Sequence, residues 1–123
     1  MLEKKLKAYN KNNKMKKYKI DVTGKAEQDM FEIYAYIAKQ DSILKAENFY
    51  DKLEEICASL EHFPERGHFL SDLKDLSNNT YREIHFKSYR IIYKITDNLV
   101  SIYGILDSRR ELKHLLMQRL IKA

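Results

Sequence analysis

Basic and aromatic side chains alternate along the segment from Tyr81 to Ile95, which reads YREIHFKSYRIIYKI. Arginine and lysine bind phosphate and carboxylate groups, and an imidazole transfers protons near neutral pH. We therefore expect this segment to contact an anionic partner. Its candidate residues are Arg82, His85, Lys87, Arg90 and Lys94.

Two more arginines, Arg109 and Arg110, follow the apolar segment 99–106. A guanidinium group holds a phosphate with two parallel hydrogen bonds, and the N–H groups at a helix N-terminus attract the same anion. We therefore predict that this pair meets Arg90 and His85 at one anion-binding site.

Metal and phosphate-loop chemistry have little support in the sequence. The histidines lack the spacing of metal ligands, and no cysteine cluster accompanies them. They are His62, His68, His85 and His114. Only three glycines are present, and they form no glycine-rich phosphate loop. The single Cys57 excludes an internal disulfide, and its spacing is that of a core thiol. Taken together, these features lead us to expect neither a metal ion nor a small-molecule cofactor.

Charge is distributed unevenly along the chain, whose formal net charge is +5. Residues 1–20 contain eight lysines and one glutamate, whereas residues 21–79 contain 13 acidic and 6 basic side chains. Residues 80–119 contain 8 basic and 4 acidic side chains. This asymmetry favours a polyanionic or acidic partner on the basic side of the molecule.

Apolar periodicity indicates which elements carry these residues. Alternation from Tyr18 to Val22 predicts a short strand. Thr23 and Ser42 are suitable N-caps for two helices with apolar stripes, which would form a hairpin that ends near Gly67. The acidic residues of the second helix fall on its exposed positions, which we interpret as a solvated face.

The second half of the chain predicts strands. They are expected at about 80–86, 89–96 and 99–106, after one helical turn at 71–76. The last strand is apolar on both faces and should be central in its sheet. Ser108 and Glu111 fit a capping box for a C-terminal helix. The fold class is therefore α+β, with a helical hairpin on a twisted, mainly antiparallel sheet of about four strands.

The strand at 89–96 presents two different faces. Tyr89, Ile91, Tyr93 and Ile95 should pack on the helical hairpin, and Arg90, Ile92 and Lys94 point the other way. Because an arginine is almost never fully buried without a partner, we expect this second face to meet solvent, a ligand or a groove. Arg82 and His85 alternate on the preceding strand, so only one of them lies on the side of Arg90.

The 123 residues are predicted to form one domain at 15–123, preceded by a basic appendage at 1–14. No apolar run is long enough for a signal peptide or a membrane span. We therefore expect a soluble, cytoplasmic protein with no membrane partner.

Four segments, in their order and spacing, resemble the RelE/ParE superfamily, the toxins of type II toxin–antitoxin pairs, which include plasmid stabilisation modules. They are AYIAKQDSILKAENFYDKLEEI, FPERG, YRIIYKI and LDSRREL. The resemblance extends over roughly residues 15–120. It implies growth arrest by the free toxin and a cognate antitoxin that wraps it.

Two actions are implied by this resemblance. Within this superfamily, RelE-like members look like endonucleases that cut ribosome-bound mRNA. ParE-like members instead inhibit DNA gyrase. The FPERG loop and the hairpin length are more similar to the ParE branch. The alternative is a non-toxic binding module that has kept the fold and binds only a partner protein.

The resemblance also implies site residues. A RelE-like site needs a base, an acid and cations for the charge that develops on phosphate. Leu116 stands where the RelE-like tyrosine acid would be, and His85 or His114 would have to substitute. If the protein is an enzyme, it is expected to be a metal-independent mRNA endoribonuclease. Its implied catalytic residues are Arg90, Arg110 and His85, and its target-binding residues are Arg82, Lys87, Lys94 and Arg109.

Overall fold

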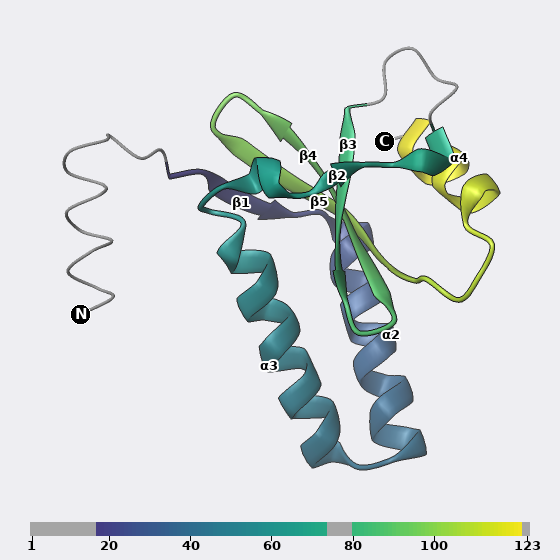
Figure 1. The fold of residues 1–123 in the computed structure, drawn as a ribbon. Helices are drawn as coiled ribbons and strands as arrows, with labels where there is room; N and C mark the ends of the chain where they lie inside the picture. Colours follow the sequence, from purple (N-terminus) through teal and green to yellow (C-terminus); the bar gives the residue numbers. More distant parts are fainter. Residues whose placement is uncertain (1–16, 74–79, 122–123) are drawn as a thin grey trace.

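The computed structural model describes residues 17–73 and 80–121, so the predicted appendage at 1–14 lies outside the described residues. They form a helical hairpin, one sheet and a C-terminal helix (Figure 1). The strands are β1 (Lys19–Val22), β2 (His68–Phe69), β3 (Tyr81–Phe86), β4 (Tyr89–Thr96) and β5 (Leu99–Asp107). The helices are α2 (Gly24–Gln40), α3 (Ile43–Ser59) and α4 (Lys113–Ile121), with short 3₁₀ turns η1 (Pro64–Arg66) and η2 (Ser71–Leu73).

The sheet has the strand order β1-β5-β4-β3-β2. Strand β1 pairs with β5 in parallel, and all other pairs are antiparallel. The predicted α+β class is confirmed, and β5 lies inside the sheet as expected. The sheet has five strands instead of about four, because the two residues of β2 pair with Arg82 and Glu83 of β3.

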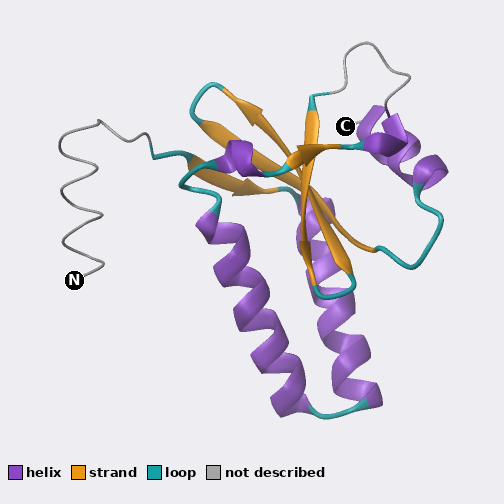
Figure 2. Ribbon diagram, in the orientation of Figure 1, coloured by secondary structure: helices purple, strands orange, loops and turns teal. Residues whose placement is uncertain are grey.

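The helical hairpin begins where its caps predict. The Thr23 hydroxyl accepts a hydrogen bond from the Ala26 N–H at 3.3 Å, and the Ser42 hydroxyl accepts one from the Lys45 N–H at 3.1 Å. These bonds satisfy N–H groups that have no partner within the first helical turn. Figure 2 shows α2 and α3 lying side by side against the sheet.

Two apolar clusters lie on opposite faces of the sheet. The hairpin covers Ile91 and Tyr93, and Cys57 is buried in the same cluster, so the predicted hairpin-facing side of β4 and the predicted core thiol are confirmed. On the other face, Ile92 and Leu106 pack with Leu70, Leu73, Leu112, Leu116 and Leu120. The expectation that this second face is open is therefore wrong, because η2 and α4 cover much of it.

Helix α4 is attached to the hairpin through a partly buried carboxylate. Asp29 of α2 accepts hydrogen bonds from the Ile105 N–H at 2.9 Å and from Arg119 Nη1 at 2.6 Å. This bond pair joins α2, β5 and α4 at one point. Among the described residues, no helix is both long enough and apolar enough to cross a membrane.

The start of α4 differs from the prediction. Strand β5 continues to Asp107, and both the N–H and the hydroxyl of Ser108 donate to the Ser88 carbonyl at 2.7 Å. Ser108 therefore fastens the chain to the β3–β4 turn and caps no helix. The helix begins at Lys113, whose N–H donates to Glu111 Oε1 at 2.8 Å. Of the helical turn expected at 71–76, η2 is present and the remainder lies outside the described residues.

Candidate functional site

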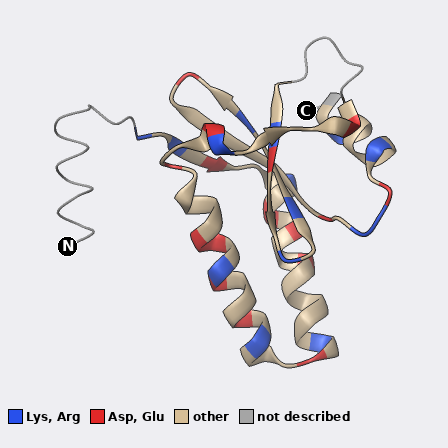
Figure 3. Ribbon diagram, in the orientation of Figure 1, with Lys and Arg blue, Asp and Glu red and all other residues tan. Residues whose placement is uncertain are grey.

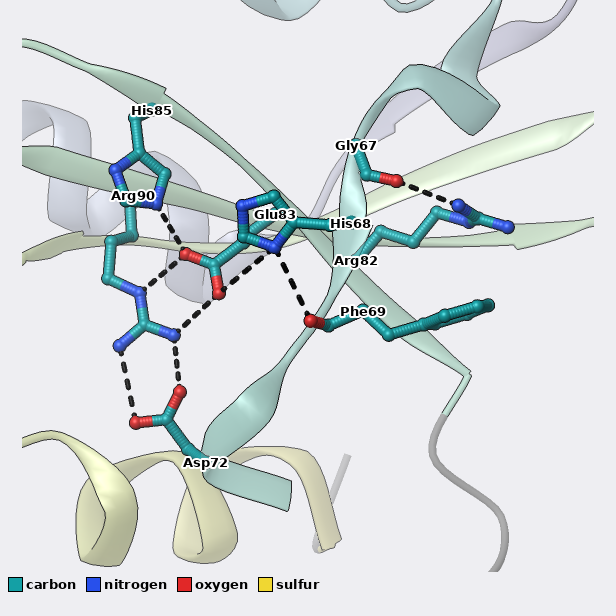
Figure 4. A network of polar contacts seen from close by, with 8 residues as sticks. All are labelled: Gly67, His68, Phe69, Asp72, Arg82, Glu83, His85 and Arg90. Carbon is teal, nitrogen blue, oxygen red and sulfur yellow. Dashed lines mark hydrogen bonds and ion pairs between the residues drawn. The ribbon is translucent and has the colours of Figure 1, made fainter. Parts of the chain in front are cut away.

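Arg90 lies in a buried cluster of charges between the sheet and η2 (Figure 4). Its Nε and Nη2 atoms each donate to a carboxylate oxygen of Glu83 at 2.8 Å, and the guanidinium also pairs with Asp72. The side chains of Arg90 and Glu83 are only 11% and 4% exposed. The predicted solvent-facing position of Arg90 is therefore wrong, because two carboxylates accompany it into the interior.

In this triad, Arg90 and its two carboxylate partners stabilise each other's charged forms. Burial alone would lower the pKa of Arg90, but hydrogen bonds to Asp72 and Glu83 raise it above its ordinary value, so the guanidinium stays charged. The hydrogen bond from Arg90 holds the pKa of the Asp72 carboxyl below its usual range. Two carboxylates against one guanidinium leave the triad with a formal excess of one negative charge.

Two imidazoles border the same carboxylate. His85 lies directly opposite Arg90 in the β3–β4 register, and its Nε2 is 2.7 Å from Glu83 Oε1. His68 lies opposite Glu83 in the β2–β3 register, with its Nδ1 atom 4.0 Å from Glu83 Oε2. The two ring centroids are 5.9 Å apart. We call His68, Glu83 and His85 the His–Glu cluster.

The sequence predicts His85 near Arg90, as observed, but does not indicate His68. In the sequence His68 follows Gly67 in a loop, where no alternating pattern marks a strand. Only the pairing of β2 with β3 brings it to Glu83. The FPERG loop does not predict this pairing. The only local indication is that a histidine, His68, follows the turn glycine directly.

A second group of candidate cations lies at the end of the sheet. The bond between Ser108 and Ser88 holds the loop after β5 against the β3–β4 turn, and basic residues occupy both segments (Figure 3). Arg109 is 70% exposed and pairs with Asp107 at 2.7 Å, which lowers the pKa of that carboxyl to about 2. We call Lys87, Arg109 and Arg110 the sheet-end basic patch.

Arg90 and Arg109 contact opposite faces of the sheet. Asp107, the partner of Arg109, pairs with Tyr89, whose ring packs against Phe49 of the hairpin. Arg90 points to Asp72 on the face that α4 covers. The geometry thus separates two cations that were expected to share one anion.

The last two candidates lie apart from both groups. Arg82 is on the hairpin side of β3, where it donates to the carbonyls of Glu65 and Gly67 and lies 4.2 Å from the centroid of the Phe69 ring. Lys94 Nζ is 5.7 Å from the centroid of the Tyr81 ring. Hydrogen bonds therefore hold Arg82 in place, whereas Lys94 has an aromatic neighbour.

Comparisons with known proteins point to one family. The family model for the ParE toxin of the type II toxin–antitoxin system parDE matches residues 20–112. No curated protein sequence matches the chain.

Two solved structures share the fold. The chromosomal ParDE toxin–antitoxin system from P. aeruginosa superimposes with a TM-score of 0.62 at 15% identity, over 73% of this chain and 95% of that chain. The RelBE2 toxin–antitoxin complex from Mycobacterium tuberculosis gives a TM-score of 0.55 at 20% identity, over 76% of this chain and 93% of that one.

Proposed function

Since this chain belongs to the family of ParE toxins of type II toxin–antitoxin systems, we propose that it arrests bacterial growth by binding and inhibiting DNA gyrase. A cognate antitoxin is its second partner and neutralises it by covering the same surface. The two solved structures described above are toxin–antitoxin systems, which supports a partner of this kind.

The observation that carries the proposal is the engagement of Arg90. A cation that stabilises a phosphoryl transition state must direct its N–H groups at the substrate. Those of Arg90 are directed at Glu83 and Asp72 instead. Leu116, at the position of the RelE-like tyrosine acid, is fully buried in the cluster under α4. These two residues favour an inhibitor that acts by binding over one that cuts RNA.

The surface for the target is proposed to include the sheet-end basic patch. Its three cations are exposed and lie on two connected loops, so they can approach an acidic protein surface or a nucleic-acid backbone without rearrangement of the sheet. Gyrase binds DNA, and exposed cations suit either the enzyme or its substrate.

The test measures growth arrest in cells and, with the purified full chain, inhibition of gyrase supercoiling and cleavage of ribosome-bound mRNA. Inducible expression should arrest growth, and co-expression of the cognate antitoxin, to be sought as a small acidic protein in the adjacent reading frame, should restore it. Purified protein should inhibit supercoiling by gyrase and leave ribosome-bound mRNA intact. Arrest with intact supercoiling and cut mRNA would refute gyrase inhibition. Absence of all three effects would support the non-toxic binding module.

One observation keeps mRNA cleavage as a second candidate. His85 is exposed and is hydrogen-bonded to Glu83, an arrangement in which a carboxylate orients an imidazole for proton transfer. In this case His85 would be the catalytic base, and Arg110 would contact the scissile phosphate. His85→Ala should then abolish cleavage, whereas His114→Ala, on the exposed side of α4, should leave it unchanged.

A further inference from the structure

The His–Glu cluster has the donor set of a metal site. One atom from each of His68, Glu83 and His85 lies within 4.8 Å of the other two. His68 and His85 do not have the spacing of metal ligands along the chain, but the neighbouring strands β2 and β3 bring their imidazoles together.

The carboxylate of Glu83 is held in place for this role. A carboxylate has about four lone-pair positions. Arg90 occupies two of them, one on each oxygen. The remaining directions face His85 at 2.7 Å and His68 at 4.0 Å (Figure 4). Arg90 thus orients the carboxylate from behind, as hydrogen-bonded groups around metal ligands commonly do.

The local charge also favours a cation. Glu83 and Asp72 outnumber Arg90 by one negative charge, and both carboxylates lie within hydrogen-bonding distance of that arginine. A divalent ion between the imidazoles and Glu83 would meet this excess charge directly. In the structure, the hydrogen bond with His85 uses Oε1 of Glu83 on the side that faces the imidazoles.

The two imidazoles are exposed and are held by hydrogen-bond contacts, His68 Nδ1 with the Phe69 carbonyl at 3.4 Å and His85 Nε2 with Glu83 at 2.7 Å. The side chains of His68 and His85 are 70% and 52% exposed, whereas that of Glu83 is 4% exposed. Tetrahedral zinc, with bonds of about 2.0–2.2 Å, needs ligand atoms about 3.4 Å apart. The present distances of 2.7 Å and 4.0 Å from Glu83 lie on either side of this spacing, so rotation of the two exposed rings is the adjustment that an ion would require.

We propose that His68, Glu83 and His85 bind a divalent cation of the zinc class. Two imidazoles and one carboxylate are ligands that zinc accepts, and imidazole also suits copper, nickel and iron. Water completes the coordination on the exposed side. The ion fastens the two residues of β2, at the edge of the sheet, to β3 and so fixes the end of the segment that joins α3 to β2.

Zinc titration of the purified full chain tests the site. Calorimetry should give one high-affinity site, and Co²⁺ should give the visible absorption of a tetrahedral complex. His68→Ala and His85→Ala should each weaken zinc binding by about tenfold or more, since loss of a ligand exceeds the 10- to 100-fold effect of losing an outer partner. Zinc should raise the melting temperature of the unchanged protein and not that of these variants.

His114→Ala is the matched control, because His114 is an exposed histidine on α4 and lies outside the cluster. Alanine at either ligand position removes an exposed ring, so the variants should keep the fold, which circular dichroism checks. Equal zinc affinity of the unchanged protein and both ligand variants would overturn the site. So would a loss of affinity in His114→Ala as large as in His68→Ala.

Discussion

Arg90 illustrates how partners decide the role of a charged residue. The same guanidinium that would bind phosphate on an open sheet is here a structural group, because Glu83 and Asp72 surround it. Removing one member of a buried ion pair leaves the others without compensation and costs about 3–5 kcal/mol. Arg90→Ala should therefore lower the free energy of unfolding by about this amount, measured by urea denaturation.

The control for this prediction is Arg109→Ala. Arg109 also pairs with an aspartate, but its side chain is 70% exposed. Surface changes of this kind usually stay within about 0.5 kcal/mol. If Arg90→Ala were as stable as Arg109→Ala, the buried triad would contribute nothing to folding, and Arg90 would again be a candidate for target binding.

Asp72 makes the triad sensitive to acid. Its pKa is lowered in the folded state by the hydrogen bond with Arg90, so the stability it contributes is present above the unfolded value of about 3.9 and is lost as pH falls through the lower folded value. Asp72→Asn should therefore be less stable than the unchanged protein at pH 7, and the difference should shrink below about pH 4. Urea denaturation at several pH values measures it, and a difference independent of pH would contradict the linkage.

Cys57 should be chemically inert in the folded protein. Burial raises the pKa of its thiol to about 12, and only the thiolate reacts with disulfide reagents. Ellman's reagent should modify Cys57 only at the rate at which the chain unfolds, and quickly in denaturant. Rapid labelling of the native protein at pH 8 would show that the cluster around Cys57 opens without unfolding.

For single residues, the sequence predicts the burial of apolar side chains better than the burial of charged ones. Cys57 and Tyr93 are buried as expected, because apolar periodicity reports which face of an element turns inward. Arg90 was misplaced because its burial depends on Glu83, two residues from its cross-strand neighbour, and on Asp72 in a distant turn. No pattern local to β4 contains that information.

Among the elements, β2 and the turn before it decide the shape of the candidate site. Gly67 lies under Tyr93, and a Cβ atom there would be 2.0 Å from Tyr93 Oη and 2.8 Å from the Glu83 carbonyl. Its φ of −73° suits any residue, so space alone requires glycine. Gly67→Ala should destabilise the protein by about 1–3 kcal/mol through overpacking.

Gly24→Ala is the matched control, since nothing lies within 4 Å of the Cβ position at the start of α2. Alanine favours a helix over glycine, so this variant should be as stable as the unchanged protein or slightly more stable. Urea denaturation compares the two. Equal stability of the two variants would mean that the loop moves away from Tyr93 at no cost.

The long elements were predictable and the short ones were not. Helices α2 and α3 each repeat their apolar stripe over 17 residues and begin at a capping side chain. Strand β2 has only two residues, both exposed, so neither alternation nor burial distinguishes it from a loop. Ser108 was assigned to a helix cap because its local pattern fits one, yet the Ser88 carbonyl from another turn takes its hydrogen bonds.

For the molecule as a whole, the separation of charge predicts how it meets a partner. The hairpin and its following loop hold most of the acidic residues, whereas the sheet-end basic patch belongs to the basic segment 80–119. Exposed charges of this kind steer association and contribute less to the affinity of the final complex.

The last prediction rests on gyrase inhibition and reverses two charges of this patch. Arg109→Glu with Arg110→Glu should weaken inhibition of supercoiling and reduce growth arrest, because both side chains are exposed and add positive charge to this surface. The loss of inhibition should be largest at low salt, because salt screens the attraction between exposed charges. Near physiological ionic strength this attraction reaches only about 8 Å, the Debye length. The control is Lys19→Glu with Lys25→Glu, which changes the net charge equally at exposed positions in β1 and at the start of α2. It should inhibit like the unchanged protein. If both double variants lose inhibition to the same degree, net charge alone acts and the patch makes no specific contact.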